Sequence, residues 1–143
     1  MKEIEKLKQG LEYRFLDEEV ANLKQAALTK CARFNNIDPT DDQKQQAAIK
    51  DLFGSTGTNV YVQPNFNCDN GKNIHVGEDF LTNYNVTILD IAPVKIGDYV
   101  MIGPNTLIAT VNHPMSPKQR RQKMAQGTPV TIGNDVWIGG NAT

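Results

Sequence analysis

Five hexapeptides in one phase decide the fold. They read Val94-Lys-Ile-Gly-Asp-Tyr99, Val100-Met-Ile-Gly-Pro-Asn105, Thr106-Leu-Ile-Ala-Thr-Val111, Val130-Thr-Ile-Gly-Asn-Asp135 and Val136-Trp-Ile-Gly-Gly-Asn141. Each has isoleucine at its third position, and glycine follows that isoleucine in four of the five. The interval from Ile108 to Ile132 is a multiple of six residues, so the phase persists across a gap. The pattern therefore indicates a six-residue structural repeat.

A six-residue period is typical of a short strand followed by a tight turn, with one aliphatic side chain per repeat directed to a common axis. Three such faces close one triangular coil, so residues 94–111 make one coil. Coils stack about 4.8 Å apart through parallel hydrogen bonding. We expect these residues on the axis: Ile96, Ile102, Ile108, Ile132 and Ile138. An earlier register with the same step runs through Cys68, Ile74, Phe80, Val86 and Ala92.

This hexapeptide pattern resembles the left-handed parallel β-helix, and the handedness comes from that resemblance, since the period alone does not fix it. The predicted fold is mainly β. The sequence Gly54-Ser-Thr-Gly-Thr58 separates it from a helical, Gln- and Lys-rich first part. We therefore predict a helical N-terminal arm at 1–58 and the β-helix at 59–143.

Two helices are expected in the arm. Acidic residues at 17–19 precede an apolar stripe at three- and four-residue spacing, which predicts a helix over 17–34. The stripe comprises Val20, Leu23, Ala27, Cys31 and Phe34. Thr40 is the expected N-cap of a second helix, which ends before the glycines that follow Phe53.

Composition excludes several classes of partner. The 143 residues carry 15 basic and 16 acidic side chains, a net charge of −1, so no global field attracts nucleic acid or an anionic membrane. No stretch approaches the roughly 18 apolar residues of a spanning helix, and the first residues lack a signal-peptide pattern. We expect a cytoplasmic protein. Cys31 and Cys68 form no CxxC pair, so reduced structural thiols are expected.

The repeat lapses at residues 112–129 and then resumes in phase, which predicts a loop inserted between two coils. Such loops often hold binding and catalytic groups, because the rigid coils fix their ends. His113 lies at the root of the loop, and Pro114 biases its backbone toward an extended conformation. His113 is therefore a candidate base. The alternative is an ordinary surface histidine.

Several segments together resemble the maltose and galactoside O-acetyltransferases, hexapeptide-repeat enzymes of the nodulation-protein type. They are Asn73-Ile-His-Val-Gly77, Asn83-Tyr-Asn-Val-Thr-Ile-Leu-Asp90, Ile96-Gly-Asp98, Ile102-Gly-Pro-Asn105, Asn112-His-Pro114 and 130–139, with Tyr13 to Asp17 in the arm. The resemblance implies a homotrimer that transfers acetyl from acetyl-CoA to a sugar hydroxyl of the maltose, glucose or galactoside type. It places the active sites in grooves between neighbouring β-helices and implies no metal.

The resemblance also assigns roles to individual residues. His113 matches the general base that removes the proton from the acceptor hydroxyl. Asp17, Asn83 and Asp90 match the acceptor-binding side. Trp137 matches an aromatic residue beside the acetyl and pantetheine part of CoA, and the Gly140 amide would meet the developing oxyanion.

Structural explanations stand beside these roles. Asp17 could be only a helix N-cap, Asp90 could satisfy a turn, and Asn83 could be a stacked amide at a coil corner. For His75, inside a repeat, we favour a structural role. The basic run in the loop could meet CoA phosphates, although solvent exposure is the simpler interpretation: Lys118, Arg120, Arg121 and Lys123.

The last coil begins its third face only at Ala142-Thr143, whereas the family continues through further coils, so we expect C-terminal coils to be missing. Two other functions remain as alternatives. One is a catalytically silent β-helix scaffold or truncated remnant. The other is a trimeric zinc hydratase, for which His75 and His113 fall short of the usual three ligands.

Overall fold

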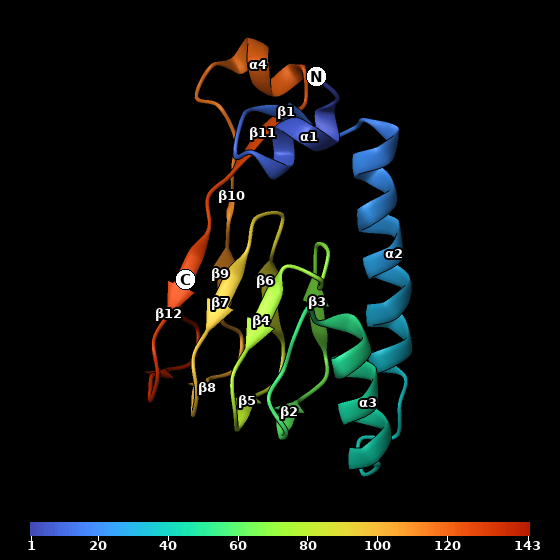
Figure 1. Ribbon diagram of the computed structural model, residues 1–143, viewed down its shortest axis with the longest axis vertical. Coiled ribbons are helices and arrows are strands. Elements are labelled where there is room, and N and C mark those ends of the chain that lie inside the picture. The colour runs from blue at the N-terminus through green and yellow to red at the C-terminus, as the bar shows by residue number, and fades with distance from the viewer.

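Three parallel sheets contain the hexapeptide repeats in the computed structural model, which describes all 143 residues (Figure 1). Their strand orders are β12-β7-β4, β13-β8-β5-β2 and β3-β6-β9, and every pairing within them is parallel. Successive coils therefore stack as a parallel β-helix, as predicted. The strands are β2 (Val60–Val62), β3 (Phe66–Cys68), β4 (Ile74–Val76), β5 (Phe80–Thr82), β6 (Val86–Leu89), β7 (Val94–Ile96), β8 (Met101–Ile102), β9 (Leu107–Ala109), β12 (Val130–Ile132) and β13 (Trp137–Ile138).

The predicted isoleucine ladder lies on the axis. Val130 pairs with Val94 and Ile138 with Ile102, so the register confirms that the phase continues across the inserted loop. In the coil that begins at Val94, Ile96 is 5% exposed and Ile102 is 1% exposed, so both are buried. Ile108 is also buried, and the two residues of the last coil, Ile132 and Ile138, are half-buried and pack against the same core.

Two of the three corners of each coil use the left-handed backbone region. The first corner follows β4, β7 and β12 and places Asp79, Tyr99 and Asp135 at φ of 50° to 58°. The second corner follows β5, β8 and β13 and places Asn85, Asn105 and Asn141 at 58° to 61°. Asn and Asp enter this region more easily than other residues that carry a Cβ. Five of these six residues are Asn or Asp, and Tyr99 is the exception, so short polar side chains make most of the turns.

The third corner is different. Ile74 pairs with Val94 and Cys68 with Ile88, so the first coils are 20 residues long, two more than the predicted 18. The early register predicted from Cys68 to Ala92 identifies buried residues, but its constant step of six is wrong at this corner. The extra residues wrap around the Asp90 carboxylate, a contact with no periodic signal.

The Ile-Gly-Asp motif stacks the coils. The Asp98 carboxylate accepts a hydrogen bond from the Glu78 amide at 2.8 Å, and Asn134 Oδ1 accepts one from the Asp98 amide at 2.8 Å. Glycine precedes each donor residue because a Cβ would collide with the acceptor: one on Gly77, before Glu78, would lie 2.1 Å from the Asp98 Oδ1, and one on Gly97, before Asp98, would lie 2.2 Å from the Asn134 Oδ1. The motif thus encodes contact between coils as well as a turn.

Helices α2 (Glu18–Asn35) and α3 (Asp42–Leu52) confirm the two helices expected in the arm, and α2 runs alongside the coils (Figure 1). Asp17 is the N-cap of α2. The N-cap predicted at Thr40 is wrong: the Asp41 carboxylate accepts from the Lys44 amide at 3.2 Å. The Thr40 hydroxyl instead donates to Asp38 at 2.8 Å, because Asp38 offers a stronger acceptor two residues away.

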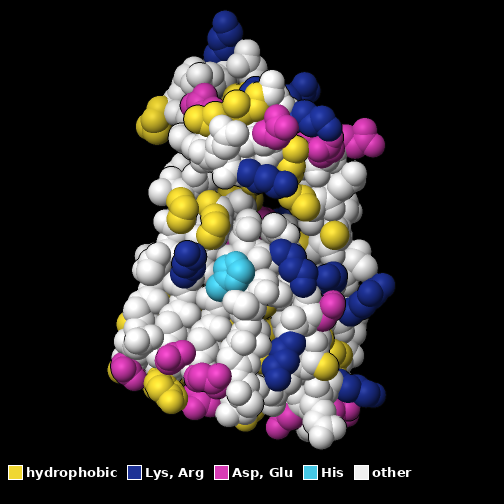
Figure 2. All heavy atoms as spheres, in the orientation of Figure 1, with side chains coloured by type: hydrophobic (Ala, Val, Ile, Leu, Met, Phe, Trp, Pro, Cys, Tyr) yellow, Lys and Arg dark blue, Asp and Glu magenta, His cyan; other side chains and the backbone are white.

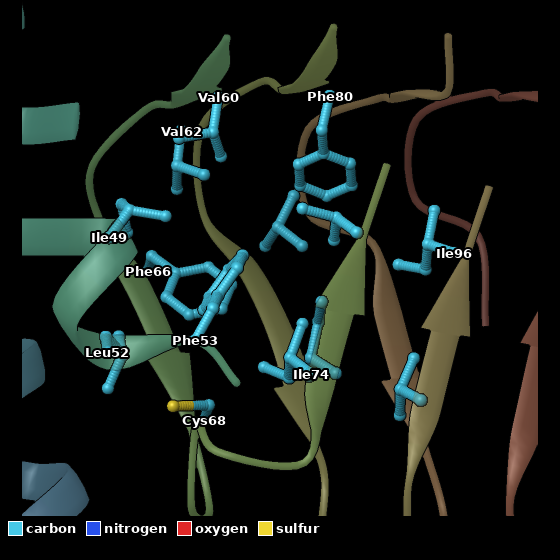
Figure 3. Close-up of a cluster of buried hydrophobic side chains, with 14 of the residues drawn as sticks. Ile49, Leu52, Phe53, Val60, Val62, Phe66, Cys68, Ile74, Phe80 and Ile96 are labelled. Atoms are coloured by element: carbon cyan, nitrogen blue, oxygen red, sulfur yellow. The ribbon is translucent and has the colours of Figure 1, made fainter. Parts of the chain in front are cut away.

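The arm and the β-helix share one core of 20 buried residues (Figure 3). Phe53, at the end of α3, packs edge-on against Phe66 of β3 and Phe80 of β5, with ring centroids 5.6 and 6.4 Å apart. Phe34 and Ile49 complete the contact from the helices. Helices α2 and α3 therefore cover the apolar end of the first coil.

A second layer was not predicted. The inserted loop folds as a hairpin of β10 (Val111–Asn112) and β11 (Met124–Gly127), with α4 (Pro117–Arg121) at its tip. Strand β11 also pairs antiparallel with β1 (Tyr13–Arg14), which follows helix α1 (Glu3–Lys8). These elements lie together above the coils in Figure 1. No helix combines the length and the apolar character needed to cross a membrane.

Gly77→Ala should lower the free energy of unfolding by about 1–3 kcal/mol, the usual cost of forcing a methyl group into a filled site. Gly133→Ala is the matched control in this 143-residue chain, since a Cβ there has no neighbour within 4 Å. Urea denaturation of both variants measures the difference. Equal stabilities would show that the glycines are not required by coil stacking.

Candidate active site

A cavity of about 350 Å³ lies between the upper layer, helix α2 and the third corner of the coils. Figure 2 shows a hollow where the upper layer meets the coils, with hydrophobic and basic side chains around it. The lining comes from the arm, the third corner and the inserted loop: Leu7, Tyr13, Phe15, Val20, Ala21, Leu23, Lys24, Asp69, Asn70, Leu89, Ile91, Val111, His113 and Ala125. Segments distant in sequence therefore meet here.

His113 is the one predicted site residue that lines this cavity. Its Nδ1 lies 2.9 Å from the Met124 carbonyl oxygen on β11. A carbonyl oxygen only accepts, so Nδ1 holds the proton and the neutral ring keeps its lone pair on Nε2. The Phe15 ring meets the imidazole edge-on at 5.5 Å and 68°. The hairpin and the arm together thus fix both the tautomer and the orientation of the ring.

The polar side of the cavity was missed by the sequence analysis. Lys24 of α2 and Asp69, directly after β3, form an ion pair with Nζ and Oδ1 2.5 Å apart, and Asn70 lies beside them. The two charged residues are 45 positions apart, so no local pattern links them. Cys31 lies on α2, as Lys24 does, and Cys68 directly precedes Asp69. Both cysteines are buried with their sulfurs 3.6 Å apart, so this contact joins α2 to the same coil.

Asp90 is fully buried and does not line the cavity. Its carboxylate accepts the backbone amides of Asp69, Asn70 and Gly71 at 3.0, 2.9 and 2.7 Å. Both oxygens therefore accept hydrogen bonds from the turn that carries Asp69 and Asn70, and the contact with an acceptor implied by the resemblance stays a prediction. Burial raises the pKa of Asp90 to about 6, against the opposing effect of the amide donors.

Asp17 and Asn83 also lie outside the cavity lining. Asp17 Oδ1 accepts from the Val20 amide at 3.3 Å, the bond of a helix N-cap. Asn83 follows β5 at the second corner, where its Oδ1 accepts from the Tyr84 amide at 2.7 Å. Within one chain, then, neither residue is placed with His113.

Trp137 and Gly140 belong to another side of the coil. Trp137 projects from β13 and is 74% exposed, and Gly140 is exposed near Pro104 at the second corner. The pairing register places Trp137 in an outward apolar column on the sheet β13-β8-β5-β2, which continues through Met101, Leu81 and Tyr61. None of these residues lines the cavity that contains His113.

The remaining candidates have local partners. His75 Nδ1 lies 2.8 Å from the Ser55 hydroxyl. Arg120 of the loop donates to the carbonyl oxygens of Pro114 and Met115 at 3.1 and 2.6 Å, which ties α4 to the residues after His113. The structure contains no group of three or more His, Cys, Asp or Glu side chains placed to hold a metal ion.

Comparison with known proteins gives close matches. The family description "Maltose acetyltransferase hexapeptide capping motif" matches residues 6–57. A crystal structure of a maltose O-acetyltransferase from Clostridium difficile 630 is 39% identical with a TM-score of 0.95, over 99% of this chain and 75% of that one. A hexapeptide-repeat acetyltransferase from Vibrio cholerae, complexed with acetyl coenzyme A, is 36% identical with a TM-score of 0.85, over 99% and 76%.

The galactoside O-acetyltransferase of Escherichia coli is 40% identical over 106 residues, which are 74% of this chain and 52% of the relative. The chain thus spans about half the length of that enzyme. The fold and these matches define the class, the left-handed β-helix acyltransferases with hexapeptide repeats. Within that class, the chain belongs to the family of the maltose and galactoside O-acetyltransferases, which includes nodulation protein L.

Asp90→Asn should lower the free energy of unfolding at pH 7 by about 1–3 kcal/mol, because an amide offers one acceptor oxygen and leaves a buried N–H unpaired. A pKa raised from 3.8 to about 6 means that the folded protein binds a proton that the unfolded chain does not in this range. Wild type should therefore gain up to about 3 kcal/mol relative to the variant as pH falls from 7 to 4. Denaturation curves at pH 7, 5.5 and 4 test this, and a constant difference would contradict it.

Proposed function

We propose that the chain is an acetyl-CoA-dependent O-acetyltransferase that moves acetyl to a hydroxyl of a sugar acceptor, with His113 as general base. One observation carries the assignment of the base: His113 lines a cavity in a member of this family, with Nδ1 donating to a backbone carbonyl and Nε2 free to accept. The acetyl coenzyme A complex of the Vibrio cholerae relative supports the choice of donor.

In the proposed reaction, Nε2 of His113 removes the proton of the acceptor hydroxyl while that oxygen attacks the thioester carbonyl. The carbon–sulfur bond then breaks, the acetyl group stays on oxygen, and CoA leaves as the thiol with the proton from the imidazolium. The Met124 carbonyl stabilises the imidazolium through the Nδ1 hydrogen bond. The same bond prevents the ring from turning its basic nitrogen away from the cavity.

A homotrimer accounts for the separation of the predicted site residues. His113 lies at the third corner, whereas Asn83 and Gly140 lie at the second corner and Trp137 projects from the face beside it. Packing one chain's Trp137 face against the next chain's third corner would complete a groove with the base on one wall and the CoA residues on the other. The exposed column of Tyr61, Leu81, Met101 and Trp137 supports a buried contact there.

Within one chain, polar contacts to the acceptor would come from residues other than those predicted. Asp69, Lys24 and Asn70 line the cavity, while Asp90 and Asp17 hold the turn and the helix that present them. Asn83 would contact the groove only from the neighbouring chain. A carboxylate and an amide at this position suit hydrogen bonds to sugar hydroxyls.

A catalytically silent scaffold is the second candidate function, and the apolar outward column favours it as much as it favours an enzyme trimer. The zinc hydratase is set aside because the chain belongs to an acyltransferase family. Release of free thiol from acetyl-CoA, dependent on an added sugar, separates enzyme from scaffold. A trimer that releases no thiol with any sugar would favour the scaffold.

His113→Ala should lower kcat by on the order of 10² to 10⁴, the usual contribution of a positioned base. His113→Asn is the sharper variant, because its amide can still donate to the Met124 carbonyl but supplies no basic nitrogen. Both variants should keep the wild-type melting temperature within a few degrees, since His113 is exposed. Thiol release under saturating substrates measures kcat, and a rate near wild type in His113→Asn would exclude the imidazole as base.

Met101→Lys together with Leu81→Lys should convert the trimer into monomers and abolish transfer, because two charges then lie in the column that packs against the neighbour. Both side chains are exposed in the single chain, at 49% and 40%, so the fold should survive. Leu28→Lys, at 47% exposure on α2, is the control. Light scattering gives the mass, and an active monomer would contradict the shared site.

A further inference from the structure

The two cysteines of the chain meet across the boundary between the arm and the coils. Cys31 lies on α2 and Cys68 ends β3, 37 positions later. Each is 3% exposed and belongs to the shared core, and their sulfurs lie 3.6 Å apart. Packing alone requires only a small apolar side chain at each position. Two thiols in direct contact also permit a covalent bond between the two elements.

The two sulfurs lie within reach of a disulfide. A disulfide bond is about 2.05 Å long, so the sulfurs of Cys31 and Cys68 have to approach by about 1.5 Å. Rotation of each side chain by about 30° about χ1 moves its sulfur by roughly 0.8 Å and stays within the breadth of one rotamer. A change confined to two side chains can therefore supply the approach.

The same contact makes the two thiols chemically different. The Cys68 thiol donates a hydrogen bond to the Cys31 sulfur, and this bond lowers the pKa of Cys31 against the opposing effect of burial. The bond and burial together raise the pKa of Cys68. Lys24, two turns earlier on α2, also lowers the pKa of Cys31, whereas the Asp90 carboxylate raises it. Since the thiolate is the nucleophile, Cys31 is the thiol that reacts first.

We propose that Cys31 and Cys68 are a site of reversible oxidation, at which hydrogen peroxide converts the two thiols into a disulfide that fastens α2 to the third corner. The Cys31 thiolate attacks one peroxide oxygen, the oxygen–oxygen bond breaks, and the departing hydroxide takes up the Cys31 proton as water. The Cys68 sulfur then attacks the resulting sulfenic acid, and its hydroxyl leaves with the Cys68 proton as a second water. The thiols lose two electrons in total, and the peroxide gains them.

The bond would lie beside one wall of the cavity. Cys68 directly precedes Asp69, and the Asp69 carboxylate pairs with Lys24 of α2, so the disulfide and the ion pair join the same two elements. In the reduced protein, α2 separates from the third corner when noncovalent contacts break. In the oxidised protein the two stay linked. This clamp does not depend on acetyl transfer, so it and the proposed function can fail separately.

Peptide mapping of the folded wild-type protein after mild treatment with hydrogen peroxide tests the chemistry. Free thiols are alkylated first, and the map is needed because the four methionines also take up oxygen. The expected product is a peptide pair linked through Cys31 and Cys68, which dithiothreitol converts back to two free thiols. A wild-type protein without this link, with a link only after denaturation, or with Cys31 converted to sulfinic acid would overturn the proposal.

The order of the two steps is tested with Cys68→Ala. Without the second thiol, the sulfenic acid on Cys31 should accumulate, and labelling by dimedone should be at least tenfold greater than in wild type. Cys31→Ala is the matched control, in which Cys68 should stay unlabelled because its pKa is raised. Equal labelling of Cys31 in wild type and Cys68→Ala would contradict the mechanism. If Cys68→Ala does not fold, the linked peptide of the wild type still decides.

The clamp itself is tested by stability and hydrogen exchange. The oxidised wild type should melt at least about 5 °C above the reduced protein, because the bond closes a loop of 37 positions in the unfolded chain. Amide exchange in α2 should slow at least tenfold, while α4 at the tip of the hairpin should not change. Peroxide-treated Cys31→Ala corrects for methionine oxidation and should show neither effect. A linked wild type with unchanged melting and exchange would overturn the clamp.

Discussion

The carboxylate of Asp90 fixes the one corner of the coil that differs from the other two. Its oxygens accept the amides of residues 69, 70 and 71, and the Thr110 hydroxyl continues the arrangement by donating to Leu89 and accepting from Ala92. The first two corners are tight turns built around a single left-handed residue, which is Asn or Asp in all but Tyr99. The third corner is wider and internally anchored, so it can present Asp69, Asn70 and Ile91 without disturbing the axis. The candidate site depends on this anchor.

The second requirement is that the N-terminal arm closes over the same corner. Strand β1 pairs with β11 of the inserted loop, and Tyr13 and Ala125 are buried at this contact. His113 therefore takes its orientation from residues at both ends of the sequence: Met124 through a hydrogen bond and Phe15 through ring contact. A general base on a free loop would lose a large part of its effect to misorientation. In the proposed reaction the arm would thus orient the base, in addition to covering the first coil.

Sequence reasoning succeeded where the signal is periodic. The step of six predicted the isoleucine axis and the in-phase gap, and the three- and four-residue spacing predicted α2, because both patterns repeat a single local rule. It failed where one contact joins distant residues. The pairing of Lys24 with Asp69, the amides gathered by Asp90, and the strand formed by Tyr13 with Ala125 depend on side chains that meet only in the folded chain. The cap bond of Asp17 and the turn bonds of Asp90 also needed the folded chain, because sequence alone cannot tell whether a carboxylate faces a ligand or a turn.

The wall of the cavity and the core of the fold are separate clusters. The core of 20 residues stacks along the coil axis, whereas Leu7, Tyr13, Val20 and Ala125 form a small second cluster, against which Phe15, Ile91 and Val111 pack. Substitutions in the second cluster leave the ladders of the axis untouched. Side chains of the arm and third corner can therefore change the shape and polarity of the cavity while the coils stay the same. In this chain the residues at those positions make the wall beside His113 apolar, and they lie outside the cluster that packs along the coil axis.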